Sequence, residues 1–399
     1  MRKDFIPVAR PDLSDTEVSA AARAILSGWV TQGPEVAAFE REFAEFVSAP
    51  HACAVSSGTT ALHLALLGVG VRPGDEVITV SHSYIATANS IRYCGAIPVF
   101  VDIDPPTFNI DPAKVEDAIS ERTRAVLCVH QMGMPCDLNS ILEIANRHGL
   151  KVVEDAACAV GSEILWNGHW EKIGHPRGDV ACFSFHPRKL LTTGDGGMLT
   201  TADAELDRKF RLWRQHGMSV PDTVRHHSSQ VVFESYPELG FNYRLTDIQA
   251  AIGREQLKRL PKALAERRQL SARYRELLSD IPGLILPSEP AWARSNWQSF
   301  CVRLPEAMPQ RDVMQKMLDE DIATRRGIMC AHLEPAYSAP GSWRCPQPGC
   351  TPGGRCPNLA ESERAQNQGV ILPLFSGLTP EQQERVCATL SASCCQPRT

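Results

Sequence analysis

Short apolar stretches alternate with amphipathic ones over the first two-thirds of the chain. The apolar stretches are rich in Val, Ile and Ala, which is typical of buried strands, and they cover His51–Val55, Glu76–Val80, Ile97–Ile103, Ala125–His130, Lys151–Glu154 and Asp179–Phe185. Helical spacing of apolar residues lies between several of them, over Ala61–Leu67, Pro112–Ile119 and Ser140–His148. The alternation predicts an α/β fold, with a mostly parallel central sheet covered by helices on both faces. Ligands of such sheets bind outside the carboxyl ends of the strands.

The pattern changes near residue 246. Thr246–Leu260 and Pro261–Leu278 read as two long, charged amphipathic helices. The residues after them, 279–399, mix short strands and helices with frequent Pro and Gly. We therefore expect a large domain over residues 1–260 and a smaller C-terminal α/β domain over residues 261–399. Pro340–Asn358 carries five prolines and four glycines, which predicts a surface loop.

Charge and composition narrow the class of protein. The formal net charge of −5 gives no electrostatic reason to expect nucleic acid or an acidic membrane as a partner. No apolar run approaches the ~18 residues that a membrane-spanning helix needs. The N-terminus also lacks the apolar core of a secretory signal. These features predict a soluble cytoplasmic protein.

The chain holds fourteen cysteines. Cys53, Cys128 and Cys182 lie in apolar strands, where a free thiol behaves as a small hydrophobic group, and we expect most cysteines to be reduced and buried. The two at the tail, 394 and 395, are expected in a disordered end.

A second group of cysteines lies in the predicted loop. Cys345, Cys350 and Cys356, with His332 upstream, suggest zinc, but their C-x4-C and C-x5-C spacings lack the C-x2-C pairs common in structural zinc sites. We therefore expect incidental thiols here and assign no metal site.

The first motif that carries chemistry is Ser56-Ser57-Gly58-Thr59-Thr60, between a predicted strand and a predicted helix. Small residues at a helix N-terminus let backbone N–H groups face an anion, and the hydroxyl groups add donors. An ordinary Ser/Thr helix cap explains the same residues equally well.

The second motif is an acid at the carboxyl end of a buried strand, followed by small residues. A carboxylate there can keep a pyridinium nitrogen protonated. Alternation along the strand favours Asp155 for this role, with Glu154 as a rival. A helix-capping Asp is the competing interpretation.

The third motif joins the strand end Phe183-Ser184-Phe185 to Lys189 and the glycine-rich turn at residues 192–197. A lysine that forms a Schiff base must be held near an aldehyde and must be neutral for part of the time. Most lysines are solvated surface residues, and the Ser, Thr and Gly residues around Lys189 set it apart.

These motifs, with others in the same order, resemble the nucleotide-sugar aminotransferases of the DegT/DnrJ/StrS type, which are fold type I pyridoxal-phosphate (PLP) enzymes. The segments that carry the resemblance are SGWVTQGPEVAAFEREFAEF from Ser27, SSGTTALHLAL from Ser56, SHSYIATANSIRYCGAIPVFVDID, VEDAACAVGS, SFHPRKLLTTGDGG and GFNYRLTDIQAAIG up to Gly253.

The resemblance implies a role for several residues. Lys189 would form the Schiff base with PLP and move the proton during catalysis. Gly58, Thr59 and Ser184 would bind the phosphate, Tyr84 would stack on the cofactor ring and Asp155 would pair with the pyridine nitrogen, while Asn242 would reach the phosphate site of a neighbouring subunit. A homodimer with shared active sites follows from the last of these. Cys158 stands where many relatives have Gln beside the cofactor, which puts that contact in doubt.

The implied reaction is transfer of an amino group from an amino acid, L-glutamate by resemblance, to a keto sugar linked to a nucleotide. This chemistry serves amino-sugar biosynthesis for lipopolysaccharides or antibiotics. An aminotransferase acting on a keto-cyclitol is an alternative. A PLP-dependent sugar dehydratase would have lost Lys189, and a non-catalytic regulator would not need an intact lysine, aspartate and phosphate-binding motif.

Overall fold

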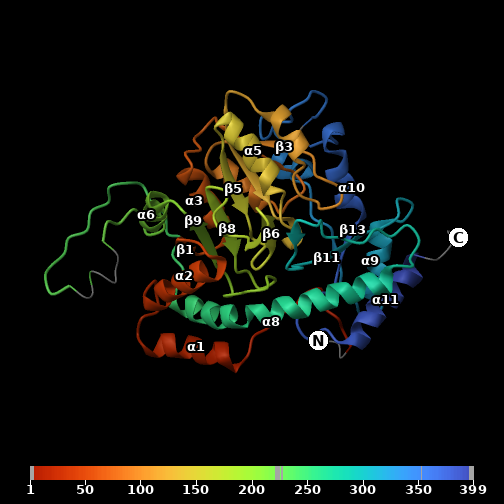
Figure 1. The fold of residues 1–399 in the computed structure, drawn as a ribbon, viewed down its shortest axis with the longest axis horizontal. Helices are drawn as coiled ribbons and strands as arrows, with labels where there is room; N and C mark the ends of the chain where they lie inside the picture. Colours follow the sequence, from red (N-terminus) through yellow and green to blue (C-terminus); the bar gives the residue numbers. More distant parts are fainter. Residues whose placement is uncertain (1–3, 221–224, 226–227, 352, 395–399) are drawn as a thin grey trace.

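The fold is built around a seven-stranded sheet (Figure 1), in a computed structural model that describes residues 4–220, 225, 228–351 and 353–394. The strand order is β1-β9-β8-β5-β4-β2-β3. All neighbouring pairs are parallel except those that β9 forms with β1 and β8. The strands are β1 (His51–Val55), β2 (Glu76–Val80), β3 (Ile97–Val101), β4 (Thr123–Val129), β5 (Lys151–Asp155), β8 (Val180–Ser184) and β9 (Gly197–Thr201). The predicted α/β fold with a mostly parallel sheet is confirmed.

Both faces of this sheet are buried, and successive side chains of each strand point to opposite faces. In β4, Val126 and Cys128 pack into one core, while Ala125 and Leu127 pack into the core on the other face. The helices of this part of the chain are α1 (Asp15–Leu26), α2 (Pro34–Val47), α3 (Gly58–Gly68), α4 (Ala86–Tyr93), α5 (Leu138–His148) and α6 (Ala204–Trp213). Among the described residues, no helix combines the length and apolar character needed to cross a membrane.

One long helix, α8 (Asp247–Leu278), replaces the two helices expected on either side of residue 260. That expectation was wrong because Pro261 lies inside the helix instead of between two helices. Proline removes one backbone hydrogen bond and usually ends or kinks a helix. Here Leu257 and Leu264, on either side of the proline, pack into the same core, and we attribute the continuity of the helix to this burial.

The C-terminal part has a core of its own. Its three-stranded sheet has the order β11-β13-β12, with β11 (Phe300–Arg303), β12 (Arg325–Arg326) and β13 (Gly369–Leu372). Helices α9 (Gln310–Asp319), α10 (Ala360–Gln368) and α11 (Pro380–Cys394) belong to it, on the right of Figure 1. Tyr274 and Leu278 bring the end of α8 into the same core. The smaller domain at residues 261–399 stays a prediction, and α8 runs through the expected boundary.

A third sheet, of order β10-β6-β7, is made by β6 (Glu163–Trp166), β7 (His169–Lys172) and β10 (Ala293–Arg294). The helix expected at Pro112–Ile119 is instead two short 3-10 turns, Pro112–Lys114 and Glu116–Ala118. Buried Val115 and Ala118 hold this segment, and it is too short and too poor in apolar residues for a full helical face.

The cysteines of the central sheet are reduced and buried as expected, whereas some of those near the C-terminus differ from the expectation. Cys53, Cys128 and Cys182 are free and buried, as expected. Cys350 and Cys356 form a disulfide, so the expectation of incidental thiols was wrong for this pair. Cys394 closes α11 instead of lying in a disordered end, and Cys395 lies outside the described residues.

Candidate active site

Two predicted site residues end neighbouring strands. Asp155 is the last residue of β5, and Ser184 is the last residue of β8. The two strands are parallel, with Asp155 paired to Cys182, so their carboxyl ends lie at the same edge of the sheet. This edge is where parallel sheets bind ligands.

The Asp155 carboxylate is buried and held by two hydrogen bonds. Thr87, in the first turn of α4, donates its hydroxyl to Oδ2 at 2.7 Å, and the backbone N–H of Ala157 donates to Oδ1 at 3.2 Å. Burial raises the pKa of Asp155, while these hydrogen bonds and the positive charge of Lys189 act in the opposite direction. A buried carboxylate of this kind gains most from a cationic partner, which a protonated pyridine nitrogen supplies.

Glu154, the rival acid, points into a different network. Its Oε2 lies 3.0 Å from Nε2 of His130, and its Oε1 accepts from the backbone N–H of Gly178 at 3.0 Å. The other ring nitrogen of His130 accepts from the Cys136 N–H, so Nε2 carries the proton and donates it to Glu154. Glu154 is thus already satisfied within the protein, and Asp155 is the better candidate.

Ser184 lies against the N-terminus of α3. A Cβ added to Gly58 would come within 2.8 Å of the Ser184 Cβ, so only glycine allows this approach. Ser57 caps the helix in a capping box with Thr60, which confirms the capping interpretation of these residues. The cap leaves the N–H groups of Gly58 and Thr59 without acceptors inside the helix. Together with the Ser184 hydroxyl, they form a set of donors that suits a phosphate group.

Lys189 is half-buried and contacts a thiol. Its Nζ donates to Sγ of Cys158 at 2.9 Å, and Cys158 follows β5 three residues after Asp155. The lysine, the aspartate and the phosphate-type donors therefore gather at one edge of the sheet. This set fits PLP, which needs an amine for its aldehyde, an acid for its ring nitrogen and donors for its phosphate.

The C-terminal part positions both segments of this site. Gln298 accepts from the Leu190 N–H at 3.1 Å and donates to the Arg188 carbonyl at 2.6 Å, which fixes the backbone on both sides of Lys189. Asn296 donates to the carbonyls of Cys158 and Val160 at 2.8 and 2.9 Å. Sequence reasoning missed both residues, because each lies more than 100 residues from its partners and in no recognisable motif.

Two further predicted residues are exposed. Tyr84 lies between β2 and α4 with 63% of its surface exposed. The helix α4 that follows carries Thr87, the hydroxyl donor to Asp155. Asn242 is exposed as well, and the carbonyl of its neighbour Tyr243 accepts from the Ser56 N–H at 2.8 Å. The segment that carries Asn242 thus adjoins the phosphate-type donors, while the role of each residue stays a prediction.

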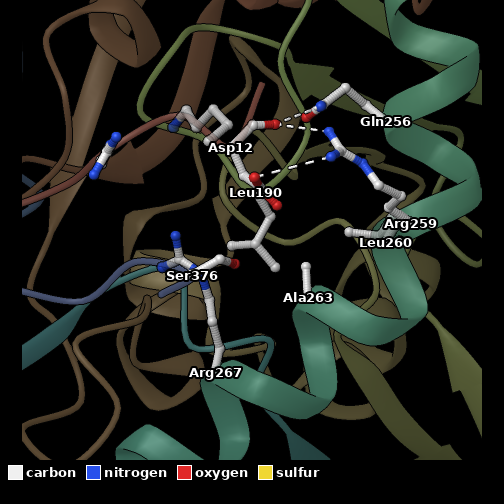
Figure 2. Close-up of a pocket in the computed structure, with 10 residues that line it drawn as sticks. Asp12, Leu190, Gln256, Arg259, Leu260, Ala263, Arg267 and Ser376 are labelled. Atoms are coloured by element: carbon white, nitrogen blue, oxygen red, sulfur yellow. Dashed lines mark hydrogen bonds and ion pairs between the residues drawn. The ribbon is translucent and has the colours of Figure 1, made fainter. Parts of the chain in front are cut away.

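A separate shallow hollow lies beside the lysine segment (Figure 2). Its lining includes Lys189, Leu190 and residues of α8, where Arg259 and Gln256 donate to the Asp12 carbonyl at 2.8 and 2.7 Å. None of Gly58, Thr59, Asp155 or Ser184 lines it. The hollow is therefore distinct from the edge of the sheet where those residues meet.

The chain matches the model of the DegT/DnrJ/EryC1/StrS aminotransferase family over residues 11–391. It is 40% identical over 389 residues to GDP-perosamine synthase from Caulobacter vibrioides, covering 96% of this chain and 97% of that protein.

Solved structures of aminotransferases are similar to this chain over nearly its full length. DesV from S. venezuelae, in complex with a ketimine intermediate, is 34% identical, with a TM-score of 0.86 over 99% of this chain and 100% of its own. Spr1654 from Streptococcus pneumoniae in its PMP-form is 25% identical, with a TM-score of 0.88 over 98% of this chain and 99% of its own. The chain belongs to the DegT/DnrJ/EryC1/StrS aminotransferase family and is a PLP-dependent aminotransferase.

Proposed function

We propose that this enzyme moves an amino group from L-glutamate to a keto sugar linked to a nucleotide, and that it works in the cytoplasm as a homodimer. The observation that carries the proposal is the position of Lys189. Its Nζ contacts the sulfur of Cys158, and its positive charge is near enough to act against the rise in the pKa of Asp155. The name of the 40% identical relative, GDP-perosamine synthase, supports a nucleotide-linked sugar as the acceptor.

Each residue has a defined task in this proposal. The N–H groups of Gly58 and Thr59 and the hydroxyl of Ser184 bind the phosphate of PLP, and Asp155 keeps the ring nitrogen protonated. Tyr84 covers the ring. When bound, PLP supplies an electron-withdrawing ring that stabilises negative charge at the donor carbon.

Lys189 handles the proton. Its neutral Nζ would take a proton from the donor carbon in the first half of the reaction and deliver a proton to the acceptor carbon in the second half. Cys158 helps to place this amine, because its sulfur accepts a hydrogen bond from Nζ. Exposed Asn242 contributes to the phosphate site of the partner subunit, which makes the dimer the active unit.

The test begins with the absorption spectrum of the purified protein with added PLP, before and after L-glutamate. We expect the band of lysine-bound cofactor to convert to that of the aminated cofactor. Lys189→Ala should bind PLP without completing turnover, while Lys262→Ala, a change at a lysine with 82% of its side chain exposed, should behave as wild type.

A panel of keto sugars linked to different nucleoside diphosphates, GDP among them, then identifies the acceptor by product mass. PLP binding without a response to L-glutamate would contradict the assigned donor. Full turnover by Lys189→Ala would contradict the role of the lysine. Turnover of a free keto-cyclitol in place of every nucleotide-linked sugar would contradict the acceptor.

A further inference from the structure

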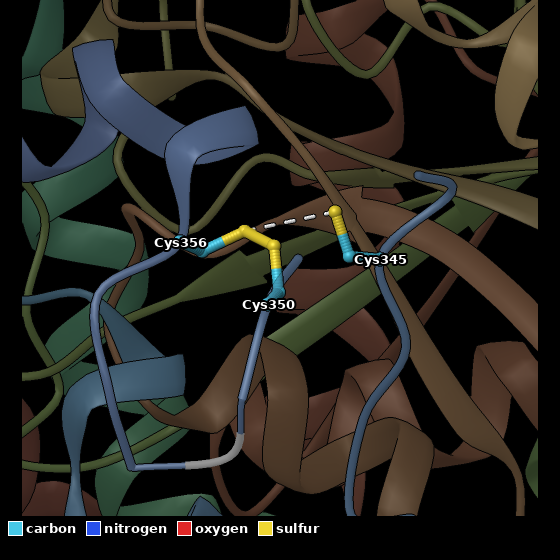
Figure 3. Close-up of side chains that lie close together, drawn as sticks. All are labelled: Cys345, Cys350 and Cys356. Carbon is cyan, nitrogen blue, oxygen red and sulfur yellow. Dashed lines mark hydrogen bonds between the residues drawn. A yellow bond between two sulfur atoms is a disulfide. The ribbon is translucent and has the colours of Figure 1, made fainter. Parts of the chain in front are cut away.

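Three cysteine sulfurs gather in the segment between the 3-10 turn Pro335–Tyr337 and α10 (Figure 3). The sulfurs of Cys345, Cys350 and Cys356 all lie within 4.8 Å of one another. Cys350 and Cys356 are joined as a disulfide, and the free sulfur of Cys345 lies 3.7 Å from that of Cys356. The fold therefore brings a third sulfur to the disulfide pair.

We propose that, in the reduced chain, these three cysteines bind one zinc ion as thiolates, with a water molecule as the fourth ligand. A tetrahedral zinc ion with Zn–S bonds of about 2.3 Å places its sulfur ligands about 3.8 Å apart. The 3.7 Å between the sulfurs of Cys345 and Cys356 is close to this value.

The chemistry of the conversion is balanced. A dithiol reductant supplies two electrons and two protons, which break the Cys350–Cys356 bond and leave two thiols. Zinc then replaces one proton on each of the three thiols, so three protons are released.

Two of the three ligands are held by the rest of the fold. Cys345 follows Arg344, whose backbone pairs with the edge strand β3 through hydrogen bonds to Pro98 and Phe100 of 2.9 Å each. Cys356 donates its backbone N–H to the Glu363 carboxylate at 2.7 Å. Only Cys350 is carried by the intervening loop, so it is the ligand that moves when the disulfide opens.

The surroundings suit a thiolate site. Cys356 packs in a cluster with Phe100, Tyr337, Trp343 and Leu359, which shields one side from water. The side-chain amide of Asn358 donates to the sulfurs of Cys345 and Cys350 at 3.4 and 3.6 Å. Hydrogen bonds of this kind stabilise negative charge on metal-bound sulfur.

His332 does not complete the set. Its Nδ1 lies 2.6 Å from the Ser81 hydroxyl, and its Nε2 lies 3.3 Å from the Glu363 carboxylate. Both nitrogens are thus engaged, which leaves the fourth position to solvent. Bound zinc would tie the proline-rich loop to the edge of the central sheet.

The experiment measures zinc in the full chain, purified with reductant and zinc sulfate and then dialysed. We expect one zinc ion per chain by elemental analysis. Cys345→Ser, which leaves the disulfide pair intact, should weaken zinc affinity at least 100-fold in competition with a chromophoric chelator. The matched control Cys394→Ser alters a half-buried cysteine outside the loop and should keep full zinc content.

A second measurement keeps the test independent of folding defects. Cobalt added to the reduced wild type should give thiolate-to-metal absorption that Cys345→Ser lacks, while both proteins keep the same melting temperature without metal. If the reduced wild type binds no more zinc than Cys345→Ser, or the disulfide persists under reductant and no metal binds, the proposal is wrong.

Discussion

Removing the hydroxyl of Thr87 should weaken PLP binding without disturbing the fold. This hydroxyl donates to Oδ2 of Asp155 at 2.7 Å, and both side chains are buried. Thr87→Val keeps the shape and removes the donor. A hydrogen bond to a charged group contributes about 1.5–3 kcal/mol. The loaded enzyme needs the Asp155 carboxylate that this hydrogen bond stabilises, so the PLP dissociation constant should rise by up to about 10- to 150-fold.

The pH dependence of PLP binding should also shift in Thr87→Val, and the direction follows from the pKa of Asp155. Burial raises the pKa of Asp155, and the Thr87 hydrogen bond lowers it. The carboxylate is present above its pKa, so PLP binding is lost as the pH falls through that value. Loss of the hydroxyl raises the pKa further, and the decline in binding should therefore begin at a higher pH in Thr87→Val.

The assay is PLP titration followed by fluorescence quenching across the neutral and mildly acidic range. Thr87→Ser keeps the hydroxyl and serves as the matched control, expected to follow wild type. Melting temperatures of the PLP-free proteins show whether the fold is intact. If Thr87→Val is folded and binds PLP with the wild-type affinity and pH profile, Asp155 is not the group that controls cofactor binding.

Three further changes test other parts of the structure. Gly58→Ala places a Cβ within 2.8 Å of the Ser184 Cβ, so thermal unfolding should show a loss of about 1–3 kcal/mol, with weaker binding of PLP. Gln298→Leu frees the backbone around Lys189, and steady-state kinetics should show kcat falling more than KM rises. Glu40 forms a buried ion pair with Arg214, so Glu40→Gln should cost about 3–5 kcal/mol in denaturant unfolding, and an unchanged midpoint would contradict this.

The sheet could be predicted from sequence because its strands are short, continuous and apolar. His51–Val55 and Glu76–Val80 were predicted with the bounds that the structure has. Asp155 and Ser184, the last residues of β5 and β8, could be placed as well, because the apolar pattern of both strands is legible in the sequence.

The remaining features depend on contacts between distant segments. The continuity of α8 through Pro261 follows from packing that no local pattern encodes. Thr87 had a weak local signal, since it lies three residues after Tyr84 in a segment already marked by resemblance. Asn296 and Gln298 had none, because the polar groups they satisfy lie far away in the chain.

The helix α8 also has a mechanical consequence. Its 32 residues span about 48 Å, with one end rooted in the core beside the central sheet and the other in the C-terminal core. If the helix tilts as one body by about 3° about one end, its other end moves by about 2.5 Å over that length. Gln298 holds the backbone next to Lys189, and Asn296 holds the backbone at Cys158, both from the C-terminal part of the chain. A small rotation of that part would therefore shift the reactive amine of Lys189.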